Sequence, residues 1–188
     1  MPLIDSLATT APMEELFSDQ SILAAMLAFE SALARTQARA GIIPEAAAQA
    51  IAAAATASDF DVKALARDTL RAGTPGIPLV KALTERVRAS NPAAAGYVHW
   101  GATSQDVADT ALVLVLKRAQ PVLELDLVRL EDALQGLAVH HADTVMLGRT
   151  LLQAAPPITF GLKAAGWLAD AHRSRTRLNA AFAEALIL

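Results

Sequence analysis

Apolar residues recur along most of the chain at spacings of three and four positions, the period of an α-helix that buries one face. The first such segment spans 18–40 and ends before Gly41, a residue type that commonly terminates helices. The predicted buried face of this helix consists of Ile22, Met26, Phe29 and Leu33. The pattern therefore predicts one long amphipathic helix near the start of the chain.

Three shorter helical segments follow, each bounded at one end by glycine or proline. Pro44 opens an alanine-rich helix that fades near Ala57. Ser58 with Asp61 reads as a capping box for a short helix that ends before Gly73. Pro78 can be the first residue of the next helix, because its missing N–H would have no partner there. The apolar face of that helix is predicted to carry Leu79, Leu83 and Val87.

The most regular apolar pattern covers about 105–141, where leucines keep a heptad-like phase. These leucines are Leu112, Leu116, Leu123, Leu127, Leu130, Leu134 and Leu137. Pro121 falls inside the pattern, and an internal proline normally kinks or ends a helix. The leucine phase nevertheless continues across it. We predict one long bent helix, and two helices that meet near Gln120 remain the alternative.

The segment "DTVMLGRTLLQAAPP" at 143–157 interrupts the helices, and a last helix is predicted to start near Pro156 or Pro157. No alternation of apolar and polar residues, typical of strands, is found, so the predicted fold class is all-α. We predict an N-terminal helical domain at 1–104 and the first part of a long-helix bundle at 105–188. Because the sequence stops at "EALIL" in mid-helix, we expect it to be the N-terminal portion of a longer protein.

Composition narrows the functional classes. The chain has 188 residues and is 54% hydrophobic, mostly through alanine, which favours closely packed helices over a membrane protein. No apolar run approaches the roughly 20 residues that span a bilayer. The start lacks a signal peptide and cysteine is absent, so we expect a cytoplasmic protein without disulfides or cysteine metal sites. A net charge of -3 without a basic stripe argues against nucleic-acid binding.

Polar residues crowd into "HWGATSQD" at 99–106, just before the long helix. In one interpretation this is only a helix cap, with Thr103 or Ser104 as the capping residue and Asp106 in the first turn. That interpretation leaves His99, Trp100 and Gln105 without a role. In the second interpretation, the free N–H groups of the helix start, with the hydroxyls and amide beside them, bind a carboxylate. The segment alone favours the cap slightly.

A second candidate lies in "GRTLLQ" at 148–153, where Arg149 could bind a carboxylate with both arms of its guanidinium group. Alone, it reads as a surface arginine. The two candidate segments flank a helix of roughly 36 residues, over about 50 Å long at about 1.5 Å per residue. One site made from both must therefore form between subunits. Since no metalloprotease, Walker or dinucleotide motif is found, we expect no metal and no cofactor.

The segments "YVHWGATSQDVADTA" and "MLGRTLLQAAPPITFGLKAAGWL" resemble the first and second conserved regions of the fumarase/aspartase superfamily, which includes argininosuccinate and adenylosuccinate lyases. The segments at 16–47 and 77–87 resemble its 3-carboxy-cis,cis-muconate cycloisomerase branch, and the resemblance covers essentially the whole chain. It implies an all-α subunit, a homotetramer built on a central bundle, and active sites contributed by three subunits. It also implies a catalytic serine on a Gly-Ser-Ser loop beyond position 188, so we expect no catalytic base in this chain and no activity from it alone.

Carried over residue by residue, the resemblance implies two groups of substrate-binding residues. The first group is His99, Thr103, Ser104 and Gln105, and the second is Arg149, Thr150 and Gln153. Trp100 and Asp106 are expected to support the first group. Leu151 stands where the amine-eliminating lyases carry a histidine that helps to protonate the leaving group.

The resemblance implies lactonisation of 3-carboxy-cis,cis-muconate, an anionic substrate, in aromatic catabolism. In the reverse direction a carboxylate leaves, and with a conjugate-acid pKa of about 4 it needs no general acid. Leu151 therefore favours a cycloisomerase over an amine-eliminating lyase. The sequence also leaves open a 3-sulfomuconate substrate and a non-enzymatic helical oligomerisation module.

Overall fold

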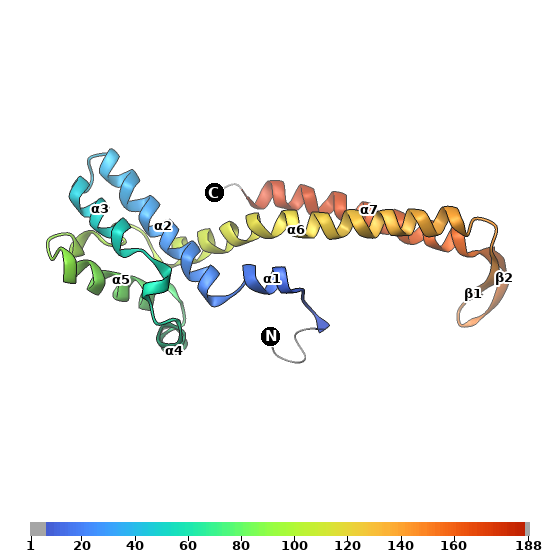
Figure 1. Cartoon of the computed structure of the whole chain (residues 1–188), viewed down its shortest axis with the longest axis horizontal. Coiled ribbons are helices and arrows are strands. Elements are labelled where there is room, and N and C mark those ends of the chain that lie inside the picture. Colours follow the sequence, from blue (N-terminus) through green and yellow to red (C-terminus); the bar gives the residue numbers. More distant parts are fainter. Residues whose placement is uncertain (1–6, 187–188) are drawn as a thin grey trace. The chain divides into compact units, whose positions relative to one another are not determined.

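The computed structural model describes residues 7–186, and these divide into two compact units, one up to Arg118 and one from Ala119. Figure 1 shows helices along nearly the whole chain, which confirms the predicted helical class apart from one small sheet. The α-helices are α1 (Ala11–Leu16), α2 (Asp19–Arg39), α3 (Glu45–Ala54), α4 (Val62–Ala72), α5 (Gly76–Ser90), α6 (Ser104–His140) and α7 (Phe160–Ala185). Two short 3-10 helices are η2 (Ala57–Asp59) and η3 (Ala95–Tyr97). The predicted mid-helix ending at 187–188 lies outside the described residues.

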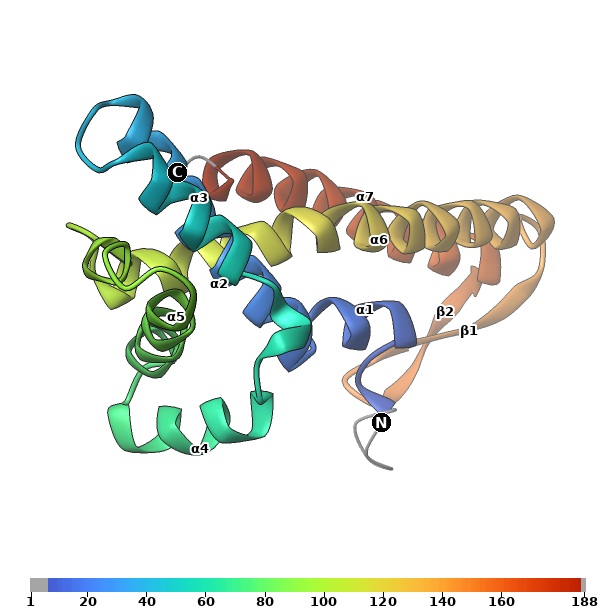
Figure 2. The ribbon, with the colours of Figure 1, turned by 60° about the vertical axis from the view of Figure 1, so that its left-hand side comes forward.

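The core of the first unit is made by α2, α3, α5 and the start of α6, and α2 and α3 run side by side in both views (Figures 1 and 2). Its most deeply buried large side chains are Leu27, Ile51, Leu79, Leu83, Val87, Val107 and Val115. The predicted apolar face of α5 is confirmed by three of these. No helix within residues 7–186 has the length and hydropathy needed to cross a membrane.

The buried stripe of α2 differs from the predicted one. It consists of Leu23, Ala25, Met26, Leu27, Glu30, Ser31 and Ala34, whereas Ile22 is 36% exposed. Of the predicted face, only Met26 is fully buried. The reason is that Glu30 lies in the buried stripe with a partner of its own, and a pattern of apolar residues assigns a glutamate to the surface.

Local capping chemistry explains the helix boundaries of this unit. The Ser18 hydroxyl accepts the Ser21 N–H at 3.2 Å, so α2 begins where predicted. The predicted capping box of Ser58 and Asp61 is wrong. Asp61 is itself the capping residue of α4 and accepts the Ala64 N–H at 3.0 Å, whereas Ser58 belongs to η2. Gly73 ends α4 in the left-handed region that suits glycine, with φ of 72°.

Helix α6 runs unbroken from Ser104 to His140 with Pro121 inside it, which confirms one long helix and excludes a break near Gln120. In its first half the buried side chains are Val107, Ala111, Val115 and Ala119. The predicted leucine seam lies beside this stripe and is partly exposed, for example at Leu112 (52%) and Leu130 (47%). The heptad phase therefore predicted the length of the helix, while small and β-branched residues make its packed face.

The segment after α6 is a β-hairpin, and the prediction that no strand is present was wrong. Strand β1 (Val145–Thr150) pairs antiparallel with β2 (Gln153–Thr159). The register shifts between Leu147 and Gly148, so Pro156 is the extra residue of a bulge on β2. A β-carbon on Gly148 would lie 2.4 Å from the Pro156 carbonyl oxygen, so only glycine fits there. Helix α7 starts after the prolines, capped by the Thr159 hydroxyl.

Within the second unit, α7 packs on the second half of α6. A β-carbon on Gly161 would lie 2.6 Å from the Ala138 carbonyl oxygen and 2.7 Å from that of His141, so the helices meet backbone to backbone there. Further along, Arg175 of α7 lies 3.2 Å from a Glu131 carboxylate oxygen and 3.5 Å from one of Glu124. These partly exposed pairs fix the alignment of two helices and contribute little free energy each.

Candidate active site

The segment 99–106 forms a turn in which two residues have positive backbone φ angles. His99 has φ of 57° and Gly101 has φ of 71°, both in the left-handed region. For a residue with a β-carbon such as His99, this conformation costs about 1 kcal/mol and is held by surrounding contacts. The turn leads the chain to Ser104, the first residue of α6.

The cap of α6 comes from Asp106, not from a hydroxyl group. Its carboxylate accepts the Thr103 N–H at 2.8 Å, and its own N–H donates to the Thr103 carbonyl oxygen at 3.0 Å. Within residues 7–186 the hydroxyl groups of Thr103 and Ser104 make no hydrogen bond. Gln105 donates from its amide to the Asp109 carboxylate at 2.6 Å. The start of α6 therefore presents two free hydroxyls beside its unpaired N–H groups.

The His99 side chain is anchored in the first unit by a buried carboxylate. Its Nδ1 lies 2.6 Å from Oε1 of Glu30, with 12% of the His99 side chain and 0% of the Glu30 side chain exposed. The hydrogen bond to Glu30 is the main cause that raises the pKa of His99, while burial acts in the opposite direction. Sequence patterns missed Glu30, because its partner lies 69 positions away.

Trp100 supports the same turn. Its carbonyl oxygen accepts a hydrogen bond from the Gln37 amide at 2.6 Å, which ties the turn to α2 a second time. Its ring lies 6.1 Å from that of Tyr97 and is 51% exposed. The backbone contact of Trp100 explains its place in the fold, while half of its surface stays exposed.

The start of α5 also meets the start of α6. A β-carbon on Gly76 would lie 2.8 Å from the Ser104 β-carbon and 3.0 Å from its α-carbon. Two helix N-termini therefore converge, and both direct N–H groups and positive partial charge to this region. The sequence analysis did not single out Gly76, and it placed the start of this helix at Pro78 rather than Gly76.

The second group lies on the hairpin of the second unit. Arg149 and Thr150 end β1, Gln153 begins β2, and Leu151 and Leu152 form the two-residue loop between them. Both leucines have positive φ, 48° and 62°, as a type I′ turn requires, although that turn favours asparagine and glycine. They are 91% and 103% exposed. The hairpin tip is therefore both strained and exposed.

Arg149 shares a hollow of about 570 Å³ with Lys163, which stands in the first turn of α7. Its lining consists of Met146, Leu147, Arg149, Ile158, Leu162 and Lys163. No acidic residue lines it, and within the part of the chain that the structure describes neither cation forms an ion pair. Lys163 was not among the predicted site residues. The Lys163 ammonium lies 5.3 Å from the centre of the Trp167 ring. Two cations without acidic partners, beside apolar side chains, suit an organic anion.

A family model described as lyase matches residues 7–188, which is nearly the whole chain. The chain belongs to this lyase family, within the fumarase/aspartase superfamily. The 3-carboxy-cis,cis-muconate cycloisomerase of Pseudomonas putida is 50% identical over 176 residues, which are 94% of this chain and 42% of that protein. The nitrosuccinate lyase of Streptomyces davaonensis is 49% identical over 184 residues, 98% of this chain and 39% of that one.

The fold supports the same assignment. The crystal structure of 3-carboxy-cis,cis-muconate lactonizing enzyme from Pseudomonas putida matches with a TM-score of 0.88 at 48% identity. The match covers 96% of this chain and 41% of that one. This lyase-family chain thus spans about two fifths of the length of the relatives it matches.

The two groups of predicted site residues lie in different units of this lyase-family chain. The structure brings His99, Thr103 and Ser104 together at the start of α6, and it brings Arg149, Thr150 and Gln153 together on the hairpin. All residues of each group belong to a single unit. Each group presents hydrogen-bond donors, and the hairpin group adds the charged guanidinium of Arg149.

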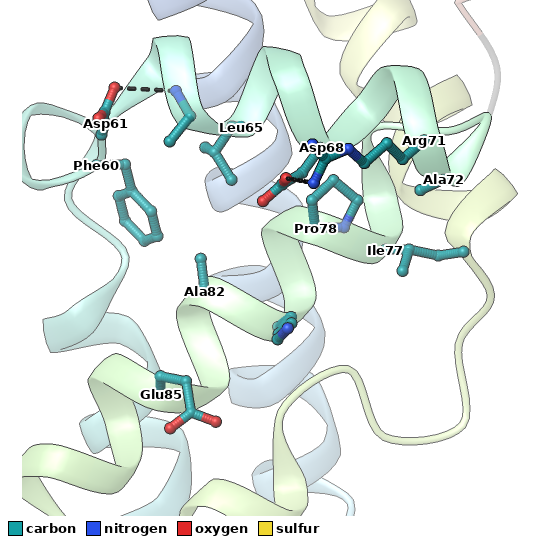
Figure 3. A pocket seen from close by; sticks show the side chains of 12 residues that line it. Phe60, Asp61, Leu65, Asp68, Arg71, Ala72, Ile77, Pro78, Ala82 and Glu85 are labelled. Carbon is teal, nitrogen blue, oxygen red and sulfur yellow. Dashed lines mark hydrogen bonds and ion pairs between the residues drawn. The ribbon is translucent and has the colours of Figure 1, made fainter.

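A further hollow of about 520 Å³ lies between α4 and α5 and contains none of the predicted site residues (Figure 3). Phe60, Leu65 and Pro78 form part of its wall, and its lining contains both acidic and basic side chains. Asp68 pairs with Arg71 at 4.0 Å across exposed side chains. This balance of charge does not suit a polyanion, so we place the active site elsewhere.

Proposed function

We propose that the whole protein is a cycloisomerase that closes a lactone ring in a 3-substituted cis,cis-muconate, with 3-carboxy-cis,cis-muconate as the first candidate substrate. The observation that carries this proposal is Leu151 at the hairpin tip. The similarity to muconate cycloisomerases over 94% of the chain supports the same reaction class.

Leu151 matters because of what an elimination requires. The tip residues Thr150, Leu151, Leu152 and Gln153 include no group that titrates near neutral pH. An amine that leaves must be protonated, whereas a carboxylate is already stable as an anion. The tip therefore suits a reaction in which the bond to be made or broken joins carbon to a carboxylate oxygen.

Two sets of donors are available for the substrate carboxylates. One carboxylate would bind the α6 N-terminus through its N–H groups, Thr103, Ser104 and Gln105, with the His99 ring behind them. A second would bind Arg149 and Lys163 in their hollow, next to Thr150 and Gln153. We assign the two sets to different subunits of a homotetramer, so that each active site is built between chains.

The exposed apolar surface of the second unit supports such an assembly. Leu125 is 51% exposed, Leu162 63% and Trp167 45%. Such exposed apolar side chains would be covered at a subunit interface. In a bundle of several chains, the leucine seam of α6 would be covered by neighbouring helices.

The reaction would proceed within one substrate molecule. One carboxylate oxygen attacks a carbon of the diene, a new C–O bond forms, and the displaced π electrons take up a proton at the neighbouring carbon. Because nucleophile and diene belong to one molecule, the enzyme has mainly to fold the substrate and to stabilise the enolate-like charge. We place the proton donor outside this chain, on the Gly-Ser-Ser loop of the superfamily. No cofactor takes part.

A second candidate is the elimination of nitrite from nitrosuccinate. The 49% identity to a nitrosuccinate lyase over 184 residues supports it, and so does Leu151. Nitrite is a weak base like carboxylate and leaves without a proton donor. A 3-sulfomuconate would satisfy the same donors as a 3-carboxymuconate, whereas an amine-eliminating reaction is disfavoured by Leu151.

Alanine variants in the whole protein test the site assignment. Arg149→Ala and Ser104→Ala should lower kcat/KM for 3-carboxy-cis,cis-muconate by at least about tenfold, with the folded structure retained. If both variants keep normal turnover, the residues do not bind substrate. That outcome would favour a helical oligomerisation module over an enzyme.

A further inference from the structure

Glu30 is a fully buried carboxylate in the stripe of α2 that otherwise packs the core. A buried charge without a partner is expensive, so such a group is kept only where it is paired. Its partner is His99, at 2.6 Å between Oε1 and Nδ1. This contact joins α2 to the turn before α6, where the first group of site residues stands.

The charged groups that face His99 come from two helices. Glu30 faces it from α2 and Asp106 from the first turn of α6, and the Thr103 backbone carbonyl also lies against the ring. All three favour the protonated ring, and together they raise the pKa of His99 despite its burial. The ring of Phe29 lies 6.5 Å away and closes the apolar side. These neighbours favour the imidazolium form of His99, whose Nδ1–H donates to Glu30.

We propose that Glu30 is a positioning residue: its carboxylate fixes the His99 side chain and thereby the 99–103 turn that presents the start of α6 to an anionic substrate. The substrate part of this inference rests on the proposed function. The turn needs such an anchor, because His99 and Gly101 both have positive φ. Glu30 itself touches no substrate, since its side chain is wholly covered.

The charge of the Glu30–His99 pair should also make substrate binding depend on pH. With His99 protonated, the Glu30–His99 pair is neutral and leaves the positive end of α6 free to attract an anion. When His99 loses its proton, a bare carboxylate remains buried behind the site. Substrate binding should therefore weaken as the pH rises through the raised pKa of His99.

The test is Glu30→Gln in the whole protein, because glutamine keeps the shape and an oxygen acceptor but removes the charge. We expect KM for 3-carboxy-cis,cis-muconate to rise about tenfold, with a smaller change in kcat. We also expect the rise of KM with pH to move to lower pH than in the parent protein. Glu30→Asp keeps the charge and should return KM and its pH profile toward those of the parent.

Ser31→Ala is the matched control. Ser31 is the next residue of α2 and is also buried, at 8% exposed, but the residue paired with His99 is Glu30. If Glu30 has a purely structural role, Glu30→Gln and Ser31→Ala should change stability alike and leave the pH profile of KM unchanged. That result would overturn the inference. If Glu30→Gln does not fold, the pH profile of the parent protein decides: a KM that does not rise with pH would overturn the inference.

Thermal denaturation at several pH values tests the pair without any substrate. Because the pKa of His99 is raised in the folded state, the pair stabilises fully below about pH 6.5 and loses its effect as pH rises through the raised value. The melting-temperature deficit of Glu30→Gln should therefore be largest near pH 6 and shrink by about pH 9. A deficit that does not depend on pH would contradict the charged pair.

The two proposals can fail separately. If the melting temperatures show this pH dependence but the protein does not act on muconate, the proposed function is wrong and the Glu30–His99 pair is still supported.

Discussion

A β-carbon on Gly76 would lie 2.8 Å from the β-carbon of Ser104, so the first turns of α5 and α6 are in direct contact. This contact sets where Ser104 and the free N–H groups of α6 stand. It also explains why a glycine lies at a buried helix start, where its backbone φ alone would not require one.

Gly76→Ala should therefore displace the start of α6. Overpacking of this kind costs about 1–3 kcal/mol of stability. We expect the melting temperature to fall and KM for the substrate to rise. Thermal denaturation and steady-state kinetics of the whole protein measure both effects. Gly96→Ala is the matched control, because open space surrounds the position where its β-carbon would stand. Equal behaviour of the two variants would show that the α5–α6 contact does not shape the site.

The hairpin tip offers a test that separates stability from activity. Replacing Leu151 by asparagine and Leu152 by glycine installs the residues that a type I′ turn favours. The double variant should gain about 1–2 kcal/mol in stability by relieving two strained φ angles. If the tip lies in the active site, kcat/KM should nevertheless fall by at least about tenfold. A stabilised variant with full turnover would place the tip outside the site.

Arg149 and Lys163 are expected to act together on one carboxylate. Arg149→Lys keeps the charge but loses the two-armed geometry, and Lys163→Met removes a charge with little change in length. Each should raise KM about tenfold, since a charged hydrogen bond contributes about 1.5–3 kcal/mol. The effect of Lys163→Met should shrink at high salt.

Arg177→Met is the control for those two variants, because Arg177 is an exposed residue of α7 that donates a hydrogen bond to Ser174 of the same helix. It should leave KM unchanged. If Arg177→Met raises KM as much as Lys163→Met, the effect is one of overall charge, and the hollow beside the hairpin has no special role.

The backbone contact between α6 and α7 leaves no room for a β-carbon at Gly161. Gly161→Ala places a β-carbon 2.6 Å from the Ala138 carbonyl oxygen and should cost about 1–3 kcal/mol. Gly166→Ala in the same helix meets open space and should be neutral or stabilising by up to about 1 kcal/mol. Denaturant unfolding of both variants measures the difference. If Gly161→Ala is as stable as Gly166→Ala, the two helices pack less closely than described.

The helices were predictable because their signals are local. Ser18 caps α2 through a residue three positions away, and Gly73 ends α4 by its own backbone conformation. The continuity of α6 through Pro121 followed from the leucine phase alone. In each case the residues that determine the boundary stand within a few positions of it.

The hairpin and the anchor of His99 were not predictable in this way. The strands are short, both their faces are largely exposed, and a bulge with two prolines breaks their alternation. Glu30 is buried only because a residue 69 positions away neutralises it, and no periodicity reports such a pair. The candidate site residues could be proposed from their motifs, whereas their supports Glu30, Gly76 and Lys163 required the fold.

The most direct test of the proposed function is the ultraviolet absorbance of 3-carboxy-cis,cis-muconate incubated with the whole protein, because lactone formation removes its conjugated diene. Nitrosuccinate and 3-sulfomuconate serve as parallel substrates. We predict rapid loss of diene absorbance with 3-carboxymuconate, a slower or no reaction with the remaining two, and loss of the activity in Arg149→Ala. Unchanged diene absorbance with both muconates, for a folded whole protein, would contradict the cycloisomerase assignment.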